Sequence, residues 1–149
     1  MLDAIANVTE AMWLPFKDGS AKHAWKLHVH FDFDLFLPGD VELSDARNSG
    51  KSNEKQVLRA RLAKDRCYVM DRWYGQFKLF NDINAKASSY VCRVKENSVF
   101  EVEQERLLSD EALKAGKAGV VRDVVVRMGI KSKPAAKPDH PMRIVVIEA

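Results

Sequence analysis

The residue with the clearest chemical potential is Asp71, which directly follows a short apolar run, Cys67–Met70. The run predicts a strand, and the periodic segment after it, Trp73–Ala85, predicts a helix. In open α/β sheets, ligands and metals gather outside the carboxyl ends of strands, so a carboxylate at this point is well placed to hold a cation. An aspartate before a helix is also an ordinary N-cap, and the pattern leaves both roles open.

A second polar constellation lies on a segment of alternating hydrophobicity from Lys26 to Phe36. Alternation predicts a half-buried strand with an apolar face and an opposite face that carries His28, His30, Asp32 and Asp34. Imidazole and carboxylate groups two residues apart on a strand can bind one Zn²⁺ or Fe²⁺. A solvated or helix-covered polar face is the simpler interpretation, and the metal site stands as the alternative.

The first elements that must position these residues form a hairpin followed by a helix. Pro38-Gly39-Asp40 is typical of a turn, so the segment from Lys26 to Phe36 and the segment Val41–Asp45 are expected to pair antiparallel around a turn at residues 37–40. After a polar loop at 48–53, Ser52 or Asn53 can cap a helix that runs to about Ala63.

The second half of the chain is expected to consist mainly of strands. β-branched and apolar runs predict strands at residues 90–94, 99–105, 120–128 and 142–147. One or two helical turns are expected at 109–115, a surface loop at 131–141 and a short helix at 2–13. Together the elements predict an α/β fold class, an α+β arrangement with a mixed sheet.

Composition narrows the class of protein. A chain of 149 residues with 46% apolar content fits one folded domain, and a net charge of +3 permits nucleic-acid binding without implying it. The two cysteines, Cys67 and Cys92, lie in apolar runs and are expected to be buried free thiols in a reducing compartment. No apolar stretch approaches the ~20 residues of a membrane-spanning helix. We therefore expect a cytoplasmic protein without a membrane partner.

Five segments distributed over most of the chain carry a family resemblance. They are Lys26–Asp32 (KLHVHFD), Tyr68–Tyr74 (YVMDRWY), Leu79–Phe80, Ser88–Arg93 (SSYVCR) and Gly119–Arg127 (GVVRDVVVR). Together they resemble the DDE transposases of bacterial insertion sequences, family four. The resemblance implies a ribonuclease-H-like catalytic domain that is interrupted by a β-rich insertion. Residues 1–93 would form part of the ribonuclease-H-like core, and residues 94–149 would form the β-rich insertion region.

The resemblance also implies a role for Asp71, and it shows which motifs of the family have no good match in this chain. Asp71 would be the second catalytic Asp and a metal ligand, within Asp71-Arg72-Trp73-Tyr74, where the family has Asp-Arg-Gly-Tyr. The family's first Asp motif and its Glu helix find no good match. Asp18-Gly19-Ser20 has the letters of the first motif, but it follows Pro15 and precedes a hairpin, so it is assigned to a loop. A truncated fragment is expected.

Loss of the first strand would have a structural consequence. In the ribonuclease-H-like order that strand lies between the hairpin and the strand ending at Asp71. Without it, either the hairpin pairs directly with Tyr68–Met70 or backbone groups at the strand edges stay unpaired.

The expected function follows from the family's chemistry. DDE transposases cleave and join DNA with two Mg²⁺ ions, and a lone Asp71 cannot fix two ions, so a transposase fragment inactive by itself is expected. The expected partner is DNA, namely transposon ends, bound through Arg72, Arg93 and Lys95, with Arg66 also near Asp71. Two alternatives stay open: a non-catalytic module that binds DNA or full-length transposase, and a small His/Asp metalloprotein.

Overall fold

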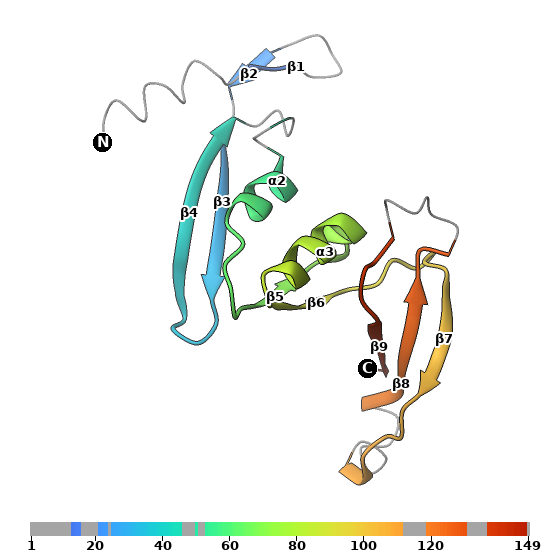
Figure 1. Cartoon of the computed structure of the whole chain (residues 1–149). Coiled ribbons are helices and arrows are strands. Elements are labelled where there is room, and N and C mark those ends of the chain that lie inside the picture. The colour runs from blue at the N-terminus through green and yellow to red at the C-terminus, as the bar shows by residue number, and fades with distance from the viewer. Residues whose placement is uncertain are drawn as a thin grey trace. The chain divides into compact units, whose positions relative to one another are not determined.

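The computed structural model describes residues 13–15, 21–23, 25–45, 50, 53–111, 119–130 and 137–148. They fall into two compact units, Met1–Arg61 and Leu62–Ala149 (Figure 1). Both helices and several small sheets are present, so the mixed α+β class is confirmed. The predicted helix at 2–13 lies outside the described residues except for Trp13, which begins a strand, and the Asp18-Gly19-Ser20 motif, most of the loop at 48–53, and residues 112–118 and 131–136 also lie outside them.

The first unit contains two antiparallel strand pairs. β1 (Trp13–Pro15) pairs with β2 (Ala21–His23), and β3 (Trp25–Asp32) pairs with β4 (Leu37–Asp45). The β3–β4 hairpin confirms the predicted pairing, but the predicted turn at 37–40 is wrong, because the chain reverses at residues 33–36.

Local hydrogen bonds explain the earlier turn. Asp32 Oδ1 accepts from the backbone N–H groups of Asp34 at 2.9 Å and Leu35 at 3.1 Å, and Phe36 adopts a positive φ of 54°. Pro38 and Gly39 then fall within β4, at a register shift opposite His30 and Phe31. A bulge accommodates a proline because an N–H group is not required there.

The polar row on β3 is shorter than predicted and is not solvated. Asp34 lies in the turn, so the strand face carries His28, His30 and Asp32 with Lys26. His28 is buried, and its Nε2 lies 2.7 Å from Ser44 Oγ. Burial, and then the charge of Lys26, lower the pKa of His28. The apolar side chains of β3 occupy the exposed face instead.

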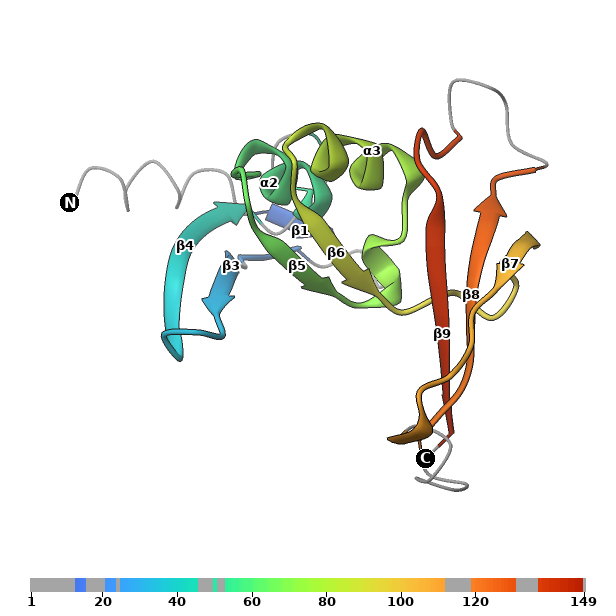
Figure 2. The ribbon, with the colours of Figure 1, turned by 60° about the horizontal axis from the view of Figure 1, so that its bottom comes forward.

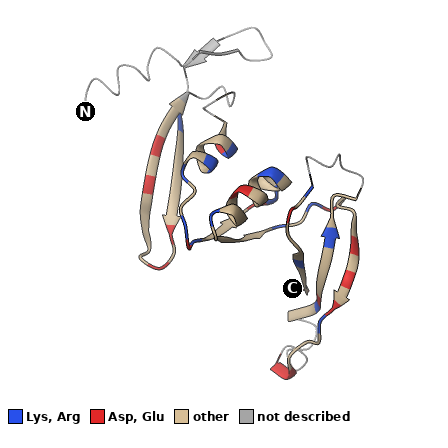
Figure 3. Cartoon of the chain, viewed as in Figure 1, with Lys and Arg blue, Asp and Glu red and all other residues tan. Residues whose placement is uncertain are grey.

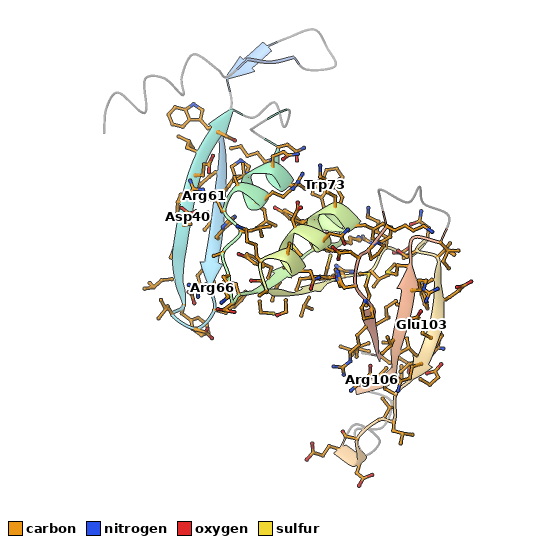
Figure 4. All side chains as sticks on the ribbon, in the orientation of Figure 1. Asp40, Arg61, Arg66, Trp73, Glu103 and Arg106 are labelled. Atoms are coloured by element: carbon orange, nitrogen blue, oxygen red, sulfur yellow. The ribbon has the colours of Figure 1, made fainter. Side chains whose placement is uncertain are left out.

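A short helix, α2 (Glu54–Ala60), is tied by charge to this polar face. Asn53 caps it, accepting from the Lys55 N–H at 3.0 Å, as the sequence predicts, but the helix ends at Ala60 rather than Ala63. Glu54 forms an ion pair with Lys26. Arg61, just after the helix, binds Asp40 at 2.7 Å and Glu42 at 2.9 Å (Figure 4).

The second unit begins with a parallel pair, β5 (Cys67–Met70) and β6 (Ser89–Cys92), in which Met70 lies opposite Cys92. Figure 2 shows the two strands side by side. β6 is the strand predicted at 90–94, shifted by one or two residues. Among the described residues, β5 and β6 form a two-stranded sheet.

The helix predicted at 73–85 is divided in two. A 3₁₀ turn, η2 (Arg72–Tyr74), is followed by Gly75 and Gln76 and then by α3 (Phe77–Ala85). The apolar side of α3 is buried at Leu79, Phe80 and Ile83. The Phe80 ring stacks on Tyr90 of β6 with centroids 4.3 Å apart.

The prediction that both cysteines are buried is wrong. Both are free thiols, but Cys67 is exposed and Cys92 is half-buried. Side chains alternate along β5 and β6, so Met70 and Cys92 share the more buried face while Cys67 lies on the opposite, open face.

The three predicted strands of the β-rich half form one antiparallel sheet, ordered β7 (Phe100–Glu105), β8 (Gly119–Met128) and β9 (Met142–Glu148). Val124, Val126 and Ile144 form its core. On the other face, the Asp123 carboxylate is buried at 7% exposure and accepts two hydrogen bonds from Arg143, at 2.8 and 2.7 Å. Arg106, just after β7, adds an ion pair at 3.3 Å, so one carboxylate joins all three strands.

The residues before β9 join this sheet to α3 and β6. Asn81 donates to the Lys137 carbonyl at 2.8 Å and accepts from the Asp139 N–H at 3.1 Å. The Tyr90 hydroxyl lies 2.8 Å from His140 Nε2, and His140 Nδ1 lies 2.6 Å from Asp139. Burial is the main cause that raises the pKa of Tyr90, so its hydroxyl stays protonated at neutral pH. These contacts position the β7–β9 sheet against the region that carries Asp71.

We predict that Asp123→Asn lowers the melting temperature at neutral pH and flattens the acid side of the stability profile. Hydrogen bonds from Arg143 are the main cause that lowers the pKa of Asp123. Its stabilising effect is therefore complete above the unfolded value of about 3.9 and is lost as the pH falls through the folded pKa. Thermal unfolding from about pH 7 down to about pH 2 measures both effects, because this range extends well below the unfolded pKa of about 3.9.

Glu105→Gln is the matched control for Asp123→Asn. Glu105 also binds an arginine, Arg122, but its side chain is 60% exposed. Exposed pairs contribute little, so its profile should follow that of the unmodified chain. An Asp123→Asn profile parallel to the control at every pH would contradict the prediction.

Candidate functional site

Asp71 combines the two roles that its sequence position left open. It directly follows the last residue of β5, with extended backbone angles of φ −74° and ψ 161°. Its Oδ1 accepts from the Trp73 N–H at 3.2 Å and so caps the 3₁₀ turn η2. The cap fixes one carboxylate oxygen, and the second oxygen, Oδ2, lies near Arg93.

The turn after Asp71 does not require a glycine at position 73. Trp73 is not among the described residues with positive φ, so a side chain is accommodated there without backbone strain. The tight position is Gly75, where an added Cβ would lie 3.1 Å from the Arg72 carbonyl oxygen and 3.6 Å from Lys95 Cε. The departure from the family's Asp-Arg-Gly-Tyr pattern therefore leaves the turn intact.

The three basic residues predicted beside Asp71 gather at the carboxyl ends of β5 and β6. Arg93 follows β6 directly, and its Nη1 lies 3.5 Å from Asp71 Oδ2, an ion pair in which the side chains are 71% and 55% exposed. Lys95 lies against Gly75, two residues before the start of α3. Arg72 binds Glu96 at 3.0 Å. Figure 3 shows that both positively and negatively charged residues occur along the second unit.

Arg66 does not belong to this group. It precedes β5, whereas Asp71 follows it, which separates the two by about 16 Å at 3.3 Å per residue. Sequence proximity alone had suggested otherwise. Glu96, in contrast, was missed as a member, although it adjoins Lys95 and its carboxylate neutralises Arg72.

Cys92 is chemically coupled to Asp71. Its Sγ–H donates to the Asp71 carbonyl oxygen at 3.4 Å. Burial is the largest cause that raises the pKa of this thiol, followed by the negative charge of Asp71, while Lys95 acts in the opposite direction. The negative charge of Asp71 therefore makes the Cys92 thiol harder to deprotonate.

As a metal site, the arrangement offers one carboxylate. Mg²⁺ prefers near-octahedral oxygen ligation, and a two-ion site needs several carboxylates at a fixed spacing. In the described part of the chain, no group of three or more His, Cys, Asp or Glu side chains is close enough to hold a metal ion. Asp71 fits one ligand position, but the described residues around it do not fit a two-ion site.

The His and Asp row of β3 is also not arranged as a metal site in the described residues. Its fourth predicted member, Asp34, lies in the turn, and Asp32 uses Oδ1 to hold that turn. His28 is bonded to Ser44. The face is instead occupied by the ion pairs to α2.

Comparison with known proteins gives one match. The sequence model of a family described as a transposase DDE domain matches residues 7–136, most of the chain. No curated protein matches, and no solved structure matches. No helix in the described ranges is long and apolar enough to cross a membrane.

We predict that Asp71→Asn increases the alkylation rate of Cys92. Removing the negative charge lowers the pKa of the thiol and raises its thiolate fraction, and the thiolate is the reacting form. The comparison is made in a Cys67→Ser background, because Cys67 is exposed and would react first. Iodoacetamide labelling followed by mass spectrometry measures the rate.

A substitution farther along the chain provides the control for this rate. Asp110→Asn removes an equal charge from a residue beyond β7 and should leave the Cys92 rate unchanged. Equal rates in the Asp71→Asn and unmodified forms would show that the charge of Asp71 does not control the reactivity of this thiol.

Proposed function

The chain belongs to the transposase DDE domain family, and from this premise we propose that Asp71 is one of the metal-binding carboxylates of a DNA transposase. The observation that carries the proposal is the position of Asp71 at the carboxyl end of a parallel strand, inside the matched region. The order of hairpin, α2, β5, α3 and β6 supports a ribonuclease-H-like core. We further propose, from the resemblance of its motifs, that the chain derives from insertion-sequence family four and acts on DNA in the bacterial cytoplasm.

The basic residues at the same strand ends are proposed to bind the DNA backbone. Arg93 and Lys95 follow β6, and Arg72 follows Asp71, so all three lie next to the proposed catalytic carboxylate. The Arg93–Asp71 pair is long and exposed, and such pairs contribute about 0–1 kcal/mol. A phosphate group can therefore recruit Arg93 at little cost in free energy.

We propose that the chain alone does not cleave DNA. The intact family uses two Mg²⁺ ions to activate the attacking oxygen and stabilise the leaving oxygen. Within the described residues, Asp71 offers Oδ2 to an ion only by giving up Arg93, and its Oδ1 is used in the backbone cap. In the family's centre, Asp71 would act together with carboxylates that the described residues do not place beside it.

A second candidate function is a non-catalytic module that binds DNA or full-length transposase. The observation in its favour is the exposure of the basic side chains, with Arg93 at 71% and Arg72 at 48%. Such a module would bind DNA in a salt-dependent manner and would not need Asp71. The two candidate functions differ in their need for metal. The non-catalytic module would bind DNA without a divalent metal ion, whereas the proposed transposase site would bind one at Asp71.

We predict that the purified chain does not nick supercoiled plasmid in Mg²⁺ or Mn²⁺ above the level of its Asp71→Ala variant. The physical reason is the single available carboxylate, which cannot fix two ions. Agarose electrophoresis of the plasmid after incubation measures nicking. Nicking by the chain that disappears in Asp71→Ala would refute inactivity and would still support Asp71 as a metal ligand.

We also predict a specific pattern of DNA affinities in metal-free buffer. Arg93→Ala and Lys95→Ala should each weaken binding and reduce the slope of log affinity against log salt by about 1. Asp71→Asn should strengthen binding, because it removes a negative charge beside Arg93. Fluorescence anisotropy with a labelled duplex over a salt series gives these values.

Arg127→Ala is the matched control for Arg93→Ala. Arg127 is 70% exposed and is also paired with a carboxylate, Glu103, but lies on β8. It should change affinity less than Arg93→Ala does. Equal losses in the two variants would indicate diffuse charge attraction and not a site at the ends of β5 and β6.

A further inference from the structure

The β3–β4 hairpin has one face that is apolar and uncovered. Trp25, Leu27, Val29 and Phe31 of β3, with Val41 opposite Val29 on β4, are between 44% and 59% exposed. At the tip of the hairpin, Phe33, Leu35, Phe36 and Leu37 are 59% to 76% exposed. We call these nine side chains the hairpin patch.

The patch is continuous from the strands to the tip. The Phe31 ring makes edge-to-face contacts with Phe33 at 5.6 Å and Phe36 at 6.3 Å between centroids. Four of the nine side chains are aromatic, with about 150–250 Å² each, and five are smaller Leu or Val side chains, so exposed fractions of 44% to 76% give a patch on the order of 1,000 Å². The largest apolar patch of a typical monomer is about 300–600 Å², so this face is typical of an interface.

The opposite face explains why the patch is uncovered. Ion pairs from Lys26 to Glu54 and from Arg61 to Asp40 and Glu42 hold α2 on the polar side of the hairpin. Because these ion pairs hold α2 against the polar face, α2 does not cover the apolar face. Among the described residues of this unit, the apolar face stays exposed and is available to a partner.

We infer that the hairpin patch binds the same patch of a second copy of this chain. A homodimer with two-fold symmetry brings the same surface of two copies together, so an apolar surface without charges is complementary to itself. From Leu27 to Phe31 on β3 and from Val41 to Leu43 on β4, the side chains of this face carry no charge. The patch also exceeds the about 800 Å² that each partner contributes to a standard interface.

The occupant suggested by this chemistry is another apolar sheet and not a nucleic acid. DNA-binding surfaces are polar and strongly positive, whereas this one is neutral and aromatic. Two twisted two-stranded layers packed face to face, about 10 Å apart, form a small sandwich. Such interfaces resemble a domain core cut in half.

The test is the oligomeric state of the full chain, measured by sedimentation over a range of concentrations. We expect a reversible dimer of the 16.9 kDa chain. Leu27→Lys should raise the dimer dissociation constant at least about tenfold, because it places an unpaired charge in an apolar interface. Val41→Lys, on the other strand of the same face, should have the same effect.

Val91→Lys is the control. Val91 has the same exposed fraction as Leu27, 59%, and also lies in a strand, β6, but outside the hairpin. It should leave the dissociation constant unchanged. Because the substituted side chains are already exposed, circular dichroism should show that all three variants stay folded.

Three results would overturn the inference. A monomer at every concentration would show that the patch is covered within one chain or binds a different partner. A dimer that persists unchanged in both Leu27→Lys and Val41→Lys would place the interface elsewhere. Equal weakening by Val91→Lys would indicate non-specific adhesion between apolar surfaces.

Discussion

The two oxygens of Asp71 are divided between the backbone and one arginine, and this division limits what the end of β5 can do. The Trp73 N–H holds Oδ1, an interaction of the capping type that contributes about 1 kcal/mol. The Arg93 guanidinium lies at 3.5 Å from Oδ2 in an exposed pair, which contributes less. Oδ1 is therefore fixed and Oδ2 can exchange partners. A cation would bind in place of Arg93 and a phosphate would bind to Arg93, so either ligand separates the same pair.

In the β3–β4 hairpin, the sequence predicts the two faces of the strand correctly but not which face is covered. Alternation from Lys26 to Asp32 places side chains on two faces, and β3 has those faces as predicted. The alternation does not indicate which of the two faces other elements cover. Burial of the apolar face was the natural expectation, yet the ion pairs of Lys26 and Arg61 attach α2 to the polar one. The position of the turn failed for a related reason, since Asp32 provides a local side-chain cap that outweighs the Pro-Gly signal six residues later.

The candidate site could be predicted where its members are close to strand ends in sequence. Asp71 and Arg93 each follow a strand by one residue, so a parallel pair of strands brings them together. Asp123 could not be predicted, because its partner Arg143 is 20 residues away and the pairing depends on the register of β8 and β9. The contact between Tyr90 and His140 spans 50 residues and has no sequence signal. Predicting a long-range polar contact requires the pairing register of the strands, and the periodicity of a single sequence does not give that register.

The distribution of charge in the second unit limits how DNA could be held there. Along β7, Glu101, Glu103 and Glu105 form an acidic edge, and two of them already neutralise Arg127 and Arg122 of β8. At the ends of β5 and β6, three cations (Arg72, Arg93 and Lys95) face two carboxylates (Asp71 and Glu96), which leaves a net charge of +1. A site of this size can neutralise only about one to three phosphates, and each contributes roughly 0.9 to the salt slope. DNA bound at the proposed site alone would therefore be held weakly and without regard to base sequence, since phosphate contacts position DNA and base contacts specify it. Under the proposed function, selection of particular transposon ends would thus require base contacts beyond the three cations around Asp71.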